Sequence, residues 1–160
     1  MKPFDSLLPF GAVALLVAGC AAPARFAPLT SLPPDRPVAY FYGPTNGTFA
    51  TCRIDYKGKR LTTINAGEYF AHQPQPGTNL YTVPAVGGGG LIGFMLDEPS
   101  ASAIRVRLES AKAYYFKGIG VNTLMRVDEV MGTNEIATCR LAKPGDVPRD
   151  ELPPPPVAAK

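Results

Sequence analysis

The placement of proline is the sequence feature that most restricts how this chain can fold. The chain has 160 residues and 18 prolines, and thirteen of these prolines lie outside residues 38–143. Proline fixes φ and removes a backbone donor, so segments rich in it do not continue helices or inner strands. We therefore predict one folded domain over residues 38–143, a tether over 20–37 and a disordered tail over 144–160. As polyproline II, the tether would reach about 50 Å.

The first 19 residues have the organisation of a bacterial signal peptide. Lys2 precedes an apolar run over residues 7–18, although Asp5 offsets its charge. As a helix the run would be about 18 Å long, too short for a hydrocarbon core of about 30 Å. A short apolar run after a basic residue and before small residues is typical of a cleaved leader.

Residues 16–20, Leu-Val-Ala-Gly-Cys, resemble the lipobox of bacterial lipoprotein precursors. The resemblance implies cleavage before Cys20 and acylation of its thiol with fatty chains such as palmitate. Two or three acyl chains anchor a protein lastingly, whereas one does not. Ala21 follows the cysteine where aspartate would resemble an inner-membrane retention signal, which implies the outer membrane, facing the periplasm. The alternative is an ordinary secreted protein in which Cys20 is incidental.

Apolar residues alternate with polar ones through the middle of the chain. Arg105 and Arg107 alternate with apolar neighbours, which places both on the outer face of a strand. Short strands separated by Gly, Pro and Lys turns predict an all-β fold, an antiparallel β-sandwich of about eight strands. The candidate strands are residues 38–42, 49–56, 61–65, 69–73, 80–83, 104–108, 113–117, 121–127 and 135–141.

Four short motifs occur in order along this domain: Tyr-Lys-Gly-Lys at 56–59, Gly-Glu-Tyr-Phe at 67–70, Pro-Gly at 76–77 and Ala-Tyr-Tyr-Phe at 113–116. Their order resembles a family of small proteobacterial lipoproteins with a PEGA-like β-sandwich. The resemblance covers residues 38 to about 142. The family has no assigned biochemical activity, so it implies no active site.

Four glycines at 87–90 introduce an apolar segment that does not follow the strand pattern. It either covers the core or forms an exposed loop that meets a membrane or a partner. The Gly-x-Gly-x-x-Gly spacing at 88–93 is not taken as a nucleotide site, because Asp97, Glu98 and Pro99 end the segment before a helix can form. The candidate contact residues are Leu91, Ile92, Phe94, Met95 and Leu96.

Cys52 and Cys139 remain once Cys20 carries lipid. In an oxidising compartment a pair is the default, and both lie at inward positions of their predicted strands. We therefore predict a disulfide, which would contribute about 4 to 5 kcal/mol in the chain-entropy model. The alternative is two separate buried thiols. The sequence indicates no metal site, since a zinc site would need further ligands.

His72 is the single histidine. We expect it at a strand edge or on the surface, on the face of its strand that carries Phe70. The acidic neighbours at 97–98 and 128–129 point to opposite faces and are interpreted as solvated turns. The aromatic residues at 114–116 are interpreted mostly as core, and Arg105 and Arg107 as solvated side chains.

These observations favour a monomeric outer-membrane lipoprotein that acts as a structural or binding module of the cell envelope, without catalysis or a cofactor. A net charge of +3 is too small to indicate a nucleic-acid partner. The expected partners are the membrane, through the lipid on Cys20, and an envelope protein or peptidoglycan. One alternative is an accessory subunit or inhibitor within an envelope assembly. Another is a hydrolase of envelope glycans or peptides that uses His72 or a carboxylate brought near by the fold.

Overall fold

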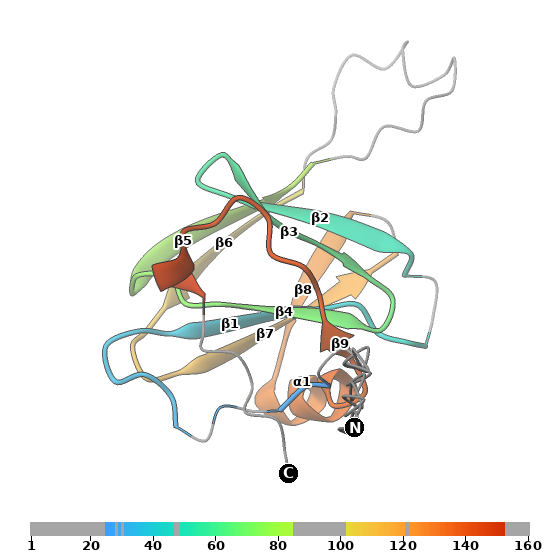
Figure 1. Ribbon diagram of the computed structural model, residues 1–160, viewed down its shortest axis with the longest axis horizontal. Coiled ribbons are helices and arrows are strands. Elements are labelled where there is room, and N and C mark those ends of the chain that lie inside the picture. The colour runs from blue at the N-terminus through green and yellow to red at the C-terminus, as the bar shows by residue number, and fades with distance from the viewer. Residues whose placement is uncertain are drawn as a thin grey trace, which may run out of the picture.

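Nine strands form two facing sheets in the computed structural model, which describes residues 25–27, 29, 31–46, 49–84, 102–120 and 122–152 (Figure 1). The predicted all-β sandwich is confirmed. Two short helices complete the described part of the chain. The elements are β1 (Val38–Tyr42), β2 (Thr51–Tyr56), β3 (Lys59–Asn65), β4 (Glu68–His72), β5 (Gly77–Val83), β6 (Ser102–Leu108), β7 (Ala113–Ile119), β8 (Thr123–Val127), α1 (Glu129–Ile136), β9 (Arg140–Leu141) and the 3-10 helix η1 (Arg149–Glu151).

The two sheets differ in how their strands are paired. The four-stranded sheet has the order β3-β2-β5-β6 and is antiparallel throughout, whereas the five-stranded sheet has the order β8-β7-β1-β4-β9 and is mixed. In the mixed sheet β1 runs parallel to β7, and β4 runs parallel to β9. The central strand β1 is buried along its whole length, which explains its unbroken run of apolar and aromatic residues.

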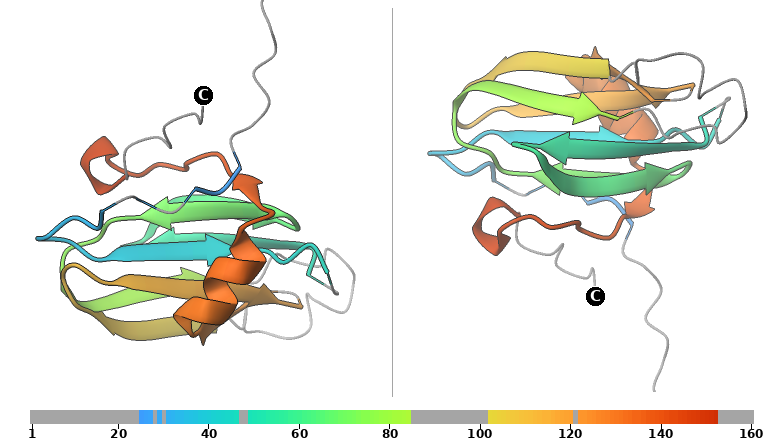
Figure 2. Two further views of the ribbon diagram at one scale, coloured as in Figure 1. Left: turned by 90° about the horizontal axis from the view of Figure 1, so that it is seen from below. Right: turned by 90° about the horizontal axis from the view of Figure 1, so that it is seen from above.

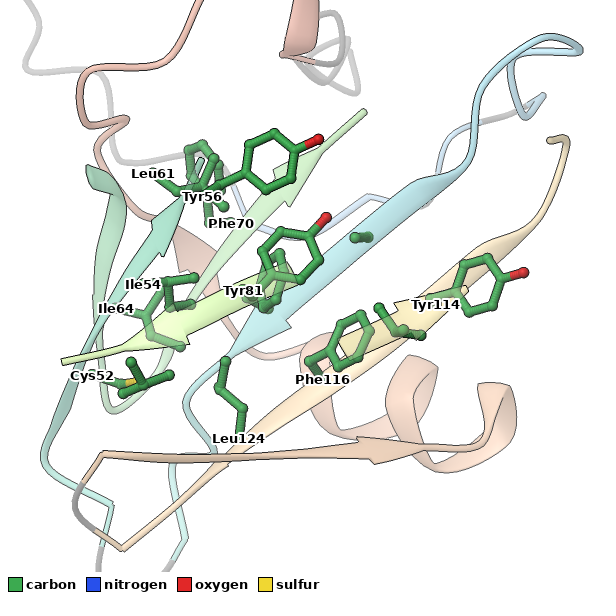
Figure 3. Close-up of a cluster of buried hydrophobic side chains, with 14 of the residues drawn as sticks. Cys52, Ile54, Tyr56, Leu61, Ile64, Phe70, Tyr81, Tyr114, Phe116 and Leu124 are labelled. Carbon is green, nitrogen blue, oxygen red and sulfur yellow. The ribbon is translucent and has the colours of Figure 1, made fainter. Parts of the chain in front are cut away.

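The inner cluster fills the space between the sheets (Figure 3). Cys52, Ile54 and Tyr56 point into it from β2, as the alternation of that strand predicts. The ring of Phe41 stacks on Phe116 with centroids 5.1 Å apart. Aromatic side chains bury large areas, and both sheets contribute them to this cluster.

The outer cluster covers the opposite face of the five-stranded sheet and includes Tyr40, Tyr69 and Tyr115. Helix α1 lies across this face (Figure 2). Gly132 permits the close approach, since a Cβ atom there would lie 2.3 Å from the Tyr115 ring. The cluster explains why all three aromatic residues at 114–116 are buried although successive residues of a strand point to opposite faces.

The predicted strand at residues 135–141 is wrong. Asp128 caps α1 by accepting a hydrogen bond of 2.9 Å from the Met131 N–H, and Glu129 follows in the first turn. An aspartate cap followed by an acidic first turn favours a helix. Only Arg140 and Leu141 of the predicted strand are extended, as β9. The acidic pair at 128–129 is therefore exposed, as predicted, but it begins a helix and does not form a turn.

The predicted disulfide is absent: Cys52 and Cys139 are free thiols, and both are buried. Cys52 belongs to the inner cluster and Cys139 to the outer cluster, so the five-stranded sheet separates the two thiols. The prediction failed because the inward position of Cys139 was derived from a strand that is absent there. Burial raises the pKa of Cys52 to about 12 and of Cys139 to about 11, which keeps both as unreactive thiols.

The predicted tether and tail pack on the domain in their described parts. Phe26 is buried between Tyr40 and Tyr69, with ring centroids 5.3 and 5.1 Å away. Val147 and Leu152 pack against the inner cluster. Proline prevents these segments from forming long regular elements, but it does not prevent their apolar side chains from being buried.

Candidate functional site: a basic groove and a buried histidine cluster

A groove of about 630 Å³ opens at the edge of the sandwich where β3, β4 and β9 meet. Its basic residues are Arg60 from β3, Arg140 from β9 and Lys143 just after β9. The lining has one carboxylate, that of Glu68. Three cations facing one anion give this groove a positive charge.

The cations of the groove are only loosely neutralised. Arg140 Nη2 lies 3.2 Å from Glu68 Oε1, and Arg60 Nη2 lies 3.9 Å from Asp146 Oδ2, with both arginine side chains more than half exposed. Exposed ion pairs of this kind contribute about 0 to 1 kcal/mol, so an incoming anion displaces them at little cost. Lys143 makes no ion pair within the described residues.

The turn between β3 and β4 holds the floor of the groove. Gly67 adopts a φ of 74°, which suits glycine, and lets the chain reverse within two residues. Asn65 then donates from its backbone N–H and from its side-chain amide to Glu68 Oε2, at 3.0 and 2.7 Å. These bonds fix the carboxylate that orients Arg140.

The N-terminal segment joins the domain beside β9 (Figure 2), the strand that supplies Arg140 to the groove. Arg25 forms an antiparallel bridge with Arg140, and the Phe26 N–H donates to the Cys139 carbonyl at 2.9 Å. The predicted tether is therefore docked from residue 25 onward, at the edge that carries the basic groove.

Residues 143–152 form a segment that we call the strap, which leaves β9 and runs along the edge strand β3 (Figure 1). Thr62 Oγ1 donates to the Lys143 carbonyl at 2.8 Å. The Gly145 and Asp146 N–H groups donate to the carbonyls of Leu61 and Arg60, both at 2.7 Å. The strap thus covers part of an exposed strand edge, which would otherwise be free to pair with another chain.

The far end of the strap is held by a buried cluster around His72. This side chain is completely buried, so the expected position on the surface is wrong. Its Nδ1 lies 3.1 Å from the Tyr81 hydroxyl, and its Nε2 lies 3.2 Å from Glu151 Oε2. The predicted shared face with Phe70 is confirmed, since both side chains are buried on the same side of β4 and His72 contacts residues of the inner cluster.

Chemistry decides the tautomer of His72. A carboxylate only accepts hydrogen bonds, so Nε2 carries the proton and donates to Glu151, and Nδ1 accepts from the Tyr81 hydroxyl. Burial lowers the pKa of His72 to about 4, against the opposing effect of Glu151. The imidazole is therefore neutral near pH 7, with both nitrogens in use.

The neighbourhood of His72 is packed against protein and not open to a substrate. The rings of Tyr56 and Tyr81 lie 4.6 and 5.9 Å from the imidazole, between centroids. A cavity of about 100 Å³ nearby is lined by Glu151 and Lys57 but not by His72. The arrangement offers no free imidazole nitrogen, and it fastens the strap.

The structure describes some of the other predicted site residues and not others. Arg105 and Arg107 are exposed on the outer face of β6, as predicted. Within the described residues, no cluster of three or more His, Cys, Asp or Glu side chains is arranged for a metal ion. Three predictions lie outside the described residues: those on Cys20, on the acidic pair at 97–98, and on the apolar residues Leu91, Ile92, Phe94, Met95 and Leu96.

Sequence reasoning did not find the residues of the groove. Arg60 and Arg140 are separated by most of the domain in sequence. The parallel pairing of β9 with β4, together with the hydrogen bonds between the strap and β3, brings them to one edge. Their single local signal is exposure, which surface cations share throughout proteins.

Comparison with protein-family models, with curated proteins and with solved structures gives no match. None of the helices within the described parts of the chain is long and apolar enough to cross a bilayer.

Proposed function

We propose that the protein is a lipid-anchored binding module of the bacterial envelope, held at the outer membrane through Cys20 and facing the periplasm. The resemblance to the PEGA-like lipoprotein family belongs to this proposal. The observation that carries a binding role is the basic groove, where three cations surround a space of about 630 Å³. Ligand pockets commonly have volumes of about 300 to 1,000 Å³.

The groove favours an anion with oxygen acceptors. Arg60 and Arg140 present planar guanidinium groups, which bind carboxylates and phosphates through two parallel hydrogen bonds. Lys143 adds a point charge from the strap. Carboxylates and phosphates are thus the two ligand groups that this surface suits.

Binding explains the groove without catalysis. The lining residues include no histidine or cysteine, and His72 is committed to Tyr81 and Glu151. A general base must lie within hydrogen-bond reach of its substrate. The groove supplies no imidazole, and its one carboxylate, that of Glu68, is held by Asn65 and Arg140. We therefore propose a module that binds and does not turn over its ligand.

Mass spectrometry of the mature protein tests the anchoring. We expect cleavage before Cys20 and a mass increase equal to two or three acyl chains. An intact leader, or a mature chain with an unmodified Cys20, would contradict the proposal.

Titration with inorganic phosphate and with acetate, followed by NMR of the arginine and lysine side chains, tests the groove. We expect the shifts to concentrate at Arg60, Arg140 and Lys143. The control is Arg105 and Arg107, which are as exposed but lie on β6. Equal shifts at both places would indicate unspecific attraction and contradict a site.

A further inference from the structure

The docked N-terminal segment limits how far the groove can stand from the membrane. Arg25 pairs with Arg140 at the groove, and Cys20 precedes Arg25 by five residues. Five residues span at most about 18 Å even when fully extended. If Cys20 carries the anchor, as the proposed function requires, Arg25 stays within that distance of the lipid.

This limit replaces the reach of about 50 Å that the proline-rich sequence predicts for a free tether. The difference arises because Phe26 is buried and its N–H is bonded to Cys139, which removes residues from 26 onward from the spacer. The edge with β9 is therefore the side of the domain held nearest to the bilayer.

That same edge carries the basic groups. We call Arg25, Arg60, Arg140 and Lys143 the tether face: Arg25 is exposed beside Arg140, and the other three line the groove. Among the residues that the structure describes, the acidic groups at this edge are Glu68 and Asp146, and each pairs with one arginine. Four cations against two carboxylates leave a net positive charge toward the lipid.

We propose that the tether face rests on the bilayer and that its groove takes the phosphate head groups of anionic phospholipids. This inference rests on the proposed function and names its ligand. A basic patch beside a lipid anchor is a recognised way to hold a protein surface against a membrane. Each basic residue near an anionic surface contributes about 1 kcal/mol, or about fivefold in binding. The attraction fades beyond a Debye length of about 8 Å, so it requires the short spacer.

The test uses the mature lipoprotein reconstituted into vesicles and a fluorescent label placed at a single introduced thiol. Thr63→Cys places the label in the groove, and Thr78→Cys places it on the outer face of β5 as a matched control. The native thiols at 52 and 139 are buried with raised pKa values, so the label reacts at the introduced site. The vesicles contain a lipid with a quencher at its head group, in phosphatidylcholine alone or with phosphatidylglycerol.

We expect the label at 63 to be quenched about threefold more than the label at 78 when phosphatidylglycerol is present, with the difference lost at high salt. The variant Arg140→Glu with Lys143→Glu should lose this difference. The variant Arg105→Glu with Arg107→Glu carries the same change in net charge and should keep it, and circular dichroism confirms that both remain folded.

Three results would overturn the inference: equal quenching at 63 and 78, quenching that ignores lipid charge, or equal losses in the two charge variants. Each of these would leave the anchor itself intact. The acyl mass on Cys20, measured on the same sample, separates them from a failure of the proposed function.

Discussion

The two ends of the strap are held by opposite physical means. At its open end, the groove end, the arginines of the two ion pairs are more than half exposed. At its closed end, Glu151 reaches a completely buried imidazole, and the Gln73 N–H donates to the Glu151 carbonyl at 2.8 Å. The closed end therefore supplies stability, whereas the open end keeps its charges available for a ligand.

The largest effect should come from removing the imidazole itself. We expect His72→Ala to lower the free energy of unfolding by about 3 kcal/mol, because it opens a cavity between two tyrosine rings and leaves two polar groups without their partner. Urea unfolding measures the change. Arg105→Ala, at an exposed site, should change stability by less than about 0.5 kcal/mol. A loss at His72 as small as that of the control would show that the closed end is not a source of stability.

Acid should weaken the closed end next. The pKa of His72 is about 4 in the folded protein and 6.5 when free, so the unfolded chain binds more protons between these values. Stability is therefore lost as the pH falls from about 6.5 toward 4, by about 2 kcal/mol at pH 5. Unfolding curves from pH 7 to 5 measure this loss. In His72→Gln the slope over this range should nearly vanish, and a slope that persists would assign the effect to another group.

Removing the carboxylate of the strap should have a smaller and more local effect. We expect Glu151→Ala to cost about 1 to 2 kcal/mol, since the buried imidazole loses an acceptor. Hydrogen exchange resolves the two ends: the Gln73 amide should lose about tenfold protection, whereas the Gly145 amide, bonded to Leu61 at the open end, should keep its rate. Equal losses at both amides would mean that the strap opens as one unit.

The smallest effect on stability is expected at the open end. Arg140→Ala removes an ion pair whose guanidinium is more than half exposed, and it should change the free energy of unfolding by less than about 1 kcal/mol because Asn65 still holds the Glu68 carboxylate. The same substitution should weaken phosphate binding by about tenfold, since an arginine bound to a phosphate contributes a charge-assisted pair. A large loss of stability without a loss of phosphate binding would contradict the proposal that the open end serves binding and the closed end stability.

Much of the sandwich could be predicted because its strands carry local signals. β6 alternates between arginines and apolar residues, and β2 alternates in the same way, so the inner and outer faces of both strands follow from the period of two. The predicted strand at 135–141 is wrong. Its first two residues belong to helix α1, and only Arg140 and Leu141 are extended. Asp128 caps helix α1, but beside the acidic Glu129 it is interpreted from the sequence as part of a solvated turn.

The candidate site was hidden for a different reason. Arg60, Arg140 and Lys143 have no spacing that marks them as a set, and His72 has ordinary neighbours in sequence. Their environments depend on which strands pair and on where the strap lies. A contact between segments that are distant in the sequence leaves no local pattern from which it could be predicted.

Local sequence patterns predict the β-rich class, the inward faces of β2 and β6, and the segments in which proline excludes long regular elements. Only the tertiary structure decided that the two cysteines lie on opposite sides of a sheet, that His72 is buried beneath the strap, and that the basic residues share one edge with the N-terminal segment. The physical reason is range. Alternation and turn chemistry act over a few residues, whereas burial and charge depend on segments that only folding brings together.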